Sequence, residues 1–274
     1  MRRALLSTLA FLACSQPPAL VQDARKLELA RSVQREMAAS VEFEKSAVLA
    51  FTDEESEAFA SKSAAASNNV DRSLAELSRL VGPSERASLE EFSTAWGRVK
   101  EADARILPLA VANTNLKAAR VSFEGAAKAL EAVLSRLEAV EAATTDPAEL
   151  RRLAHVSRAA LHIQATHMQH NVEQSDAGMS ALEAEIAGWE AEVDAELARP
   201  RRRVAPPQAL AEARDAWEKY KALTREVLRL SRLNTNVYSF VMSVRDKPPV
   251  SEAATVALER LLRDLSTSGT RPTR

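Results

Sequence analysis

Residues 89–122, LEEFSTAWGRVKEADARILPLAVANTNLKAARVS, return further along the chain as residues 210–243, LAEARDAWEKYKALTREVLRLSRLNTNVYSFVMS. Each stretch carries a tryptophan, Trp96 or Trp217, and then the triplet Asn-Thr-Asn, which begins at Asn113 or Asn234. Tryptophan is rare and this triplet is unusual in a helix, so their common offset indicates an internal duplication. The same offset aligns identical residues at Leu89/Leu210, Glu91/Glu212, Ala95/Ala216, Lys100/Lys221, Leu107/Leu228, Leu109/Leu230 and Ser122/Ser243.

The composition favours helices along the whole chain. Ala, Leu, Glu and Arg dominate the 274 residues, whereas only six glycines and two tyrosines occur. Such residues prefer helices to sheets. Apolar periodicity, capping residues and prolines predict eight helices, over residues 20–51, 52–81, 83 to beyond 109, 122–142, 147–172, 175–197, 208–244 and 251–265.

These helices predict an all-α fold, an elongated antiparallel helical bundle made of two tandem four-helix units. The first unit would cover residues 20–143 and the second residues 144–265, followed by a disordered tail over residues 266–274. In an alternative arrangement, the long helices pass through both modules and form a single elongated bundle. Pro108 is expected to kink its helix, and Lys247-Pro248-Pro249 to break the chain between the last two helices.

The first residues indicate export. Met1-Arg2-Arg3 is basic and residues 4–13 are apolar, a run too short to span a bilayer but typical of a signal peptide over residues 1–13. Phe11-Leu12-Ala13-Cys14 resembles the lipobox of bacterial lipoproteins, which implies a lipid on Cys14 and a tether over residues 14–19. A lipoprotein would lie on the periplasmic side of the outer or cytoplasmic membrane. Ordinary cleavage would leave a soluble periplasmic or secreted protein.

Charge and motifs exclude several classes of function. The chain has 37 basic and 38 acidic residues, a balance that predicts no binding to nucleic acid. Charges break every later apolar stretch, so membrane contact is expected only through the N-terminus. We expect no enzyme, because neither a Gly-x-Ser-x-Gly motif nor a Gly-rich phosphate loop occurs. We also expect no cofactor, since the single cysteine excludes a Cys-x-x-Cys-His haem motif.

Three stretches resemble the four-helix-bundle sensor domain of methyl-accepting chemotaxis receptors and related histidine kinases. They are Ile106-Leu-Pro-Leu-Ala-Val-Ala-Asn-Thr-Asn-Leu-Lys to Phe123, Leu228 to Ser243, and His162-Ile-Gln-Ala-Thr-His-Met-Gln-His170 with Glu173 and Ser175-Asp176. In that family the bundle is an extracytoplasmic ligand sensor that dimerises. The resemblance implies a lipid-anchored, sensor-like binding module for a small molecule, with a homodimer or receptor partner that carries the output. The alternatives are a structural or scaffold lipoprotein and a metal-binding bundle.

The Asn-Thr-Asn triplets are the first candidate binding residues. Asn113 and Asn234 fall at buried positions of the helical period, and a buried amide needs a hydrogen-bonding partner. That partner could be a small polar ligand between helices, with Thr114 or Thr235 assisting. In the alternative interpretation, these asparagines fix the register of the helices, as polar core residues do in coiled coils.

The histidines are the second candidate site. All four histidines of the chain fall in one predicted helix, and His167, His170 and Glu173 are spaced so that they could present metal ligands along one side. The alternative is a set of partly buried histidines that bond to water or backbone. The basic loop at Arg199, Arg201, Arg202 and Arg203 could meet anionic lipid or a carboxylate ligand, or could simply be solvated.

Overall fold

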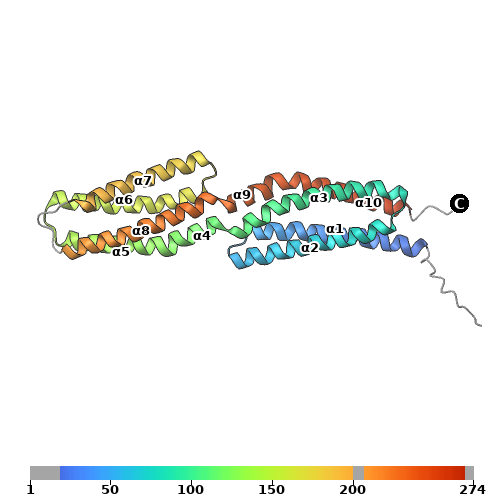
Figure 1. The fold of residues 1–274 in the computed structure, drawn as a ribbon, viewed down its shortest axis with the longest axis horizontal. Helices are drawn as coiled ribbons and strands as arrows, with labels where there is room; N and C mark the ends of the chain where they lie inside the picture. The colour runs from blue at the N-terminus through green and yellow to red at the C-terminus, as the bar shows by residue number, and fades with distance from the viewer. Residues whose placement is uncertain (1–18, 200–206, 269–274) are drawn as a thin grey trace, which may run out of the picture. The chain divides into compact units, whose positions relative to one another are not determined.

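Helices make up nearly all of residues 19–199 and 207–268, which are the residues that the computed structural model describes (Figure 1). No strand occurs in these ranges, so the predicted all-α class is confirmed. The elements are α1 (Ala19–Val48), α2 (Asp53–Leu80), α3 (Pro83–Ala112), α4 (Thr114–Arg120), η1 (Val121–Ala126), α5 (Ala127–Ala142), α6 (Pro147–Val172), α7 (Asp176–Ala198), α8 (Pro207–Leu233), α9 (Thr235–Val241), η2 (Met242–Asp246) and α10 (Lys247–Ser268). The elements η1 and η2 are π-helical turns.

Local capping explains where several helices begin. Thr52 Oγ1 accepts a hydrogen bond of 3.1 Å from the backbone N–H of Glu55 at the start of α2. At the start of α6, Asp146 Oδ1 accepts one of 2.9 Å from the N–H of Ala148, and Pro147 occupies a first-turn position that needs no donor. Each bond satisfies one N–H group that the helix itself leaves without an acceptor.

The described residues fall into two compact units. The first unit combines residues 19–40, 64–99 and 249–268. Its core is formed by apolar side chains from α1, α2, α3 and α10, among them Val33, Val70, Phe92 and Leu258.

The second unit combines residues 41–63 with residues from 100 to 248. One of its cores fills the space between α5, α6, α7 and α8, with Leu137, Val156, Val193 and Trp217 buried there. Figure 1 shows these four helices running beside one another. The units do not coincide with the sequence halves 20–143 and 144–265, because α1, α2, α3 and α10 each have residues in both units.

Two boundaries differ from those expected. The helix predicted over residues 208–244 is interrupted at Asn234, and α3 likewise ends at Ala112, just before Asn113. Conversely, Pro248 and Pro249 do not break the chain, because they lie in the first turn of α10. α10 follows the π-helical turn η2 directly, and the N–H of Lys247 donates to the carbonyl of Met242. The irregular bonding of η2 thus lies next to the two prolines, which have no N–H to donate.

Candidate functional site

Asn113 and Asn234 both adopt the left-handed backbone conformation, with φ of 50° and 52°. They are the only non-glycine residues with positive φ among those the structure describes. Asparagine enters this region more easily than most residues because its short polar side chain can bond locally. Each asparagine therefore separates two helices: Asn113 lies between α3 and α4, and Asn234 between α8 and α9.

The two threonines that follow cap each other's helices within the second unit. The N–H of Thr114 donates to Thr235 Oγ1 over 3.1 Å, and the N–H of Thr235 donates to Thr114 Oγ1 over 3.2 Å. The two hydroxyl oxygens are 3.1 Å apart. A threonine normally caps the start of its own helix. Here α4 and α9 exchange caps, so the first N–H group of each helix has its acceptor only when the other helix is in place.

The last asparagine of each triplet repeats the exchange. The N–H of Asn115 donates to Asn236 Oδ1 and the N–H of Asn236 donates to Asn115 Oδ1, each over 3.1 Å. Their side-chain amides reach the left-handed residues: Asn115 Nδ2 donates to Asn234 Oδ1 and Asn236 Nδ2 to Asn113 Oδ1, both over 2.8 Å. We call the six residues 113–115 and 234–236 the Asn-Thr-Asn crossing.

The Asn-Thr-Asn crossing also bonds to two turns that connect helices elsewhere in the second unit. Asn234 Nδ2 donates to the carbonyl of Glu173 over 2.9 Å, between α6 and α7, and Asn113 Nδ2 donates to that of Thr52 over 3.5 Å, between α1 and α2. The amides of Asn113 and Asn234 thus find their partners inside the protein. This geometry favours the register interpretation of these asparagines, while ligand binding by Thr114 and Thr235 stays a prediction.

Two histidines of α6, His167 and His170, contact hydroxyl groups. His167 is buried, with Nδ1 3.1 Å from Ser122 Oγ and Nε2 3.2 Å from Thr224 Oγ1. His170 is also buried, with Nδ1 2.6 Å from Ser231 Oγ and Nε2 3.1 Å from Glu183 Oε1. Both nitrogens of each ring therefore face groups of the protein.

Glu173 serves the start of α7. Its Oε1 accepts hydrogen bonds from the N–H of Gln174 and from the N–H and hydroxyl of Ser175. These bonds hold the pKa of the Glu173 carboxyl below its ordinary value, the Ser175 hydroxyl contributing most. Gly178 leaves room for this carboxylate, because a Cβ there would force the Glu173 side chain to shift. Within the described ranges no group of three or more His, Cys, Asp or Glu side chains is placed to hold a metal ion, so the structure does not assemble His167, His170 and Glu173 as metal ligands.

Acidification is expected to destabilise the protein through His167. Burial, and secondarily His170, lowers the pKa of His167 from 6.5 to about 4. The unfolded chain takes up this proton near pH 6.5 and the folded chain does not. The free energy of unfolding should therefore fall by roughly 3 kcal/mol between pH 6.5 and pH 4 on account of this residue. Urea unfolding across this range should show a shallower fall for His167→Gln than for the more exposed His162→Gln. Equal falls would contradict the assignment.

A buried ionic cluster of the second unit was not predicted from the sequence. Lys247 Nζ donates to Glu44 Oε2 over 2.8 Å and also to Asp103 Oδ1. All three residues are buried, and one ammonium serves two carboxylates. In the described part of the chain, Glu44 Oε1 and Asp103 Oδ2 have no hydrogen-bond donor. Burial raises the pKa of the Asp103 carboxyl above its ordinary value, although Lys247 acts to lower it.

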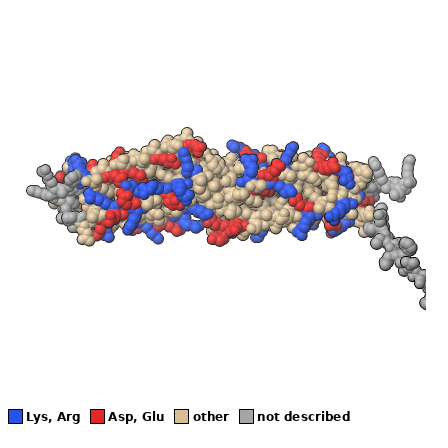
Figure 2. Space-filling model, in the orientation of Figure 1, with Lys and Arg blue, Asp and Glu red and all other residues tan. Residues whose placement is uncertain are grey.

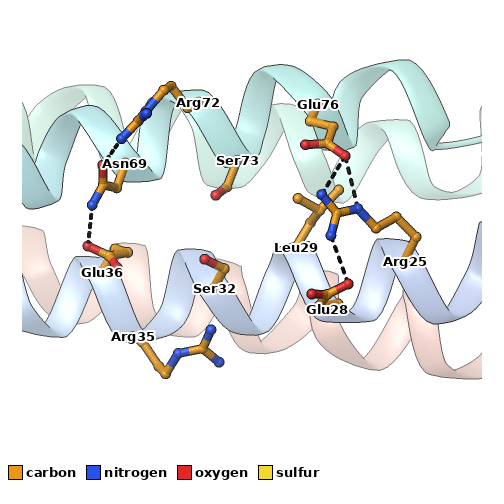
Figure 3. A pocket seen from close by; sticks show the side chains of 10 residues that line it. All are labelled: Arg25, Glu28, Leu29, Ser32, Arg35, Glu36, Asn69, Arg72, Ser73 and Glu76. Atoms are coloured by element: carbon orange, nitrogen blue, oxygen red, sulfur yellow. Dashed lines mark hydrogen bonds and ion pairs between the residues drawn. The ribbon is translucent and has the colours of Figure 1, made fainter.

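A polar groove of about 430 Å³ lies between α1 and α2 in the first unit (Figure 3). Two bridges cross it. At one end Arg25 donates to Glu76 Oε1 over 2.9 and 2.7 Å, and at the other Asn69 Nδ2 donates to Glu36 Oε2 over 2.9 Å. Between the bridges the floor is lined by small or apolar residues, Leu29, Ser32 and Ser73. Sequence patterns alone do not reveal this groove, because it depends on the register of α1 against α2.

The remaining residues considered in the sequence analysis either contact other parts of the protein or lie outside the described ranges. Cys14 and Arg201, Arg202 and Arg203 belong to the residues that the structure does not describe. Arg199 pairs with Glu196 over 3.5 Å at the end of α7. Trp96 and Trp217 are buried, and each donates its indole N–H to an aspartate, Asp71 or Asp194.

The fold is similar to a solved structure, the sensor domain of the histidine kinase sensor TorS from V. parahaemolyticus. The superposition has a TM-score of 0.58 at 10% sequence identity and covers 89% of this chain and 98% of that chain. At this identity the likeness shows a shared helical fold. No family model and no curated protein sequence matches this chain, so membership of the chemotaxis-receptor family stays a prediction.

The surface shows mixed charge. On the face that Figure 2 shows, acidic and basic side chains are interspersed. A search of the described residues for a helix long and apolar enough to cross a membrane found none.

Proposed function

We propose that this protein is a sensor-like helical binding module whose small-molecule ligand occupies the groove between α1 and α2. The proposal rests on the groove itself, because its volume of about 430 Å³ is typical of a small-molecule site. The fold shared with a histidine kinase sensor domain supports the proposal over almost the whole of both chains.

A ligand in this groove would act on the packing of α1 against α2. A ligand shifts a conformational equilibrium only by its different affinity for the two states. The Arg25–Glu76 and Asn69–Glu36 bridges both join α1 to α2, so a ligand that competes for either would change the preferred offset of the two helices. Small sliding of packed helices is a common form of such switching.

A thermal-shift screen of the mature protein against a broad metabolite panel tests this proposal. At least one compound should raise the melting temperature, since binding to the folded state alone stabilises it. Ser32→Phe and Ser73→Phe fill the groove and should abolish that rise. Ser78→Phe places the same side chain on an exposed part of α2 and should preserve it. Flat melts across the panel would exclude the binding function and favour a scaffold.

We also propose that Cys14 carries a lipid that anchors the protein, on the strength of Phe11-Leu12-Ala13-Cys14 and the apolar run before it. In cells expressing the full chain, globomycin should block processing, and Cys14→Ser should release the protein from the membrane fraction. A Ser15→Ala variant, which keeps the cysteine, should fractionate as the unaltered protein does. Membrane association that survives Cys14→Ser would overturn the proposal.

A further inference from the structure

The charges that line the groove between α1 and α2 are separated by sign. One end carries Arg25 with two carboxylates, Glu28 at 2.8 Å and Glu76 at 2.7 Å. A single guanidinium faces two carboxylates there, so this end has an excess of one negative charge. We call it the acidic end.

The opposite end has the reverse excess. Arg35 and Arg72 line it together with a single carboxylate, that of Glu36. Glu36 accepts a hydrogen bond from Asn69, and Asn69 in turn accepts one from Arg72 (Figure 3). The lining near this end therefore includes two guanidinium groups and one carboxylate, an excess of one positive charge, and we call it the basic end.

The helix geometry fixes the separation of the two ends. An α-helix rises 1.5 Å per residue, so Glu28 and Arg35 are about 10 Å apart along α1, and Arg72 and Glu76 are about 6 Å apart along α2. Between the ends, the hydroxyls of Ser32 and Ser73 point toward one another across the groove (Figure 3). The middle thus offers room and weak hydrogen bonding, and the Arg35 guanidinium lies beside it on α1 (Figure 3).

We propose that the groove binds a small zwitterion whose cationic and anionic groups are separated by several carbon atoms. The ammonium group would lie against Glu28 and Glu76, and the carboxylate against Arg35 and Arg72. The lining as a whole is electrically neutral, with three arginines and three glutamates. An ion with a single charge can therefore form a favourable charge interaction at one end only. An α-amino acid, whose charges are adjacent, cannot reach both ends. This inference rests on the proposed function and names its class of ligand.

Isothermal titration calorimetry of the mature protein with a series of ω-amino carboxylates tests the length requirement. Glycine, γ-aminobutyrate and ε-aminocaproate place the same two charges at increasing separation. Affinity should rise from glycine to ε-aminocaproate. The single-charge analogues caproate and n-hexylamine, which match the chain length of ε-aminocaproate, should bind up to about five-fold more weakly, because a charge pair at this exposure contributes up to about that factor.

Variants separate the two ends. Arg72→Gln should weaken ε-aminocaproate by about five-fold and leave n-hexylamine unchanged, whereas Glu76→Gln should weaken both amines and leave caproate unchanged. Arg79→Gln removes an exposed arginine from the same helix outside the lining and should change none of these affinities. Equal binding of zwitterion and single-charge analogues would overturn the proposal. If ligands other than zwitterions bind and are lost in Ser32→Phe, the binding function stands and the zwitterion assignment fails.

Discussion

Replacing Asn234 by alanine is expected to lower the free energy of unfolding by roughly 3–5 kcal/mol. An alanine in the left-handed conformation that Asn234 holds at φ 52° costs about 1–2 kcal/mol of conformational free energy. The substitution also removes the bonds to Asn115 Nδ2 and to the carbonyl of Glu173, and losing the partner of a buried polar group costs about 1–3 kcal/mol. Urea-induced unfolding followed by circular dichroism measures the change.

Asn234→Gly is the matched control, because glycine enters the left-handed region freely but also lacks the amide. It should be destabilised less than Asn234→Ala, by about 1 kcal/mol. The difference between the two variants reports the backbone strain, and the loss shared by both reports the hydrogen bonds. If alanine and glycine gave the same stability, the left-handed conformation would not be a constraint. If neither variant lost stability, the bonds of the Asn234 side chain to Asn115 and to the carbonyl of Glu173 would be energetically irrelevant.

The repeat located the Asn-Thr-Asn crossing, but helical periodicity could not describe it. The spacing correctly placed Asn113 and Asn234 at buried positions. It also assumed that both continue a helix, because a periodic pattern treats every residue in the window as helical. The left-handed turn is chosen by bonds to residues about 120 positions away in the chain, such as that from Asn236 to Asn113. Asparagine permits this turn locally, but no local signal in either half shows which distant residues hold it.

The ionic cluster and the groove depend even more on tertiary contacts. Glu44, Asp103 and Lys247 come from three distant parts of the sequence, and each is an ordinary residue of a helix surface by composition. Only the packing of α1, α3 and α10 shows that their charges are buried together. Capping chemistry, by contrast, is local: the helices expected over residues 147–172 and 175–197 do begin there, where Asp146 and Ser175 bond to the N–H groups of Ala148 and Gly178.

Replacing Lys247 by methionine is expected to lower the free energy of unfolding by roughly 3–5 kcal/mol near neutral pH. The substitution leaves the carboxylates of Glu44 and Asp103 buried without their cation, and removing one partner of a buried ion pair costs about that much. Methionine keeps the unbranched shape of the lysine side chain, so the loss reports charge more than volume. Urea unfolding at several pH values measures it.

The pH dependence gives the sharper test. Burial already raises the pKa of Asp103, and Lys247 opposes that rise, so the pKa should climb further in the Lys247→Met variant. A carboxyl with a higher pKa in the folded state binds more protons there than in the unfolded chain. Relative to the unaltered protein, the variant should therefore recover stability as the pH falls toward the ordinary value of 3.8, below which both states are protonated. The triple variant Glu44→Gln, Asp103→Asn, Lys247→Met, which removes all three charges, should be more stable than Lys247→Met at neutral pH. A Lys247→Met variant with unaltered stability at every pH would mean that the two carboxylates do not need the ammonium. A triple variant no more stable than Lys247→Met would mean that the shape of the side chains, and not their charge, governs the site.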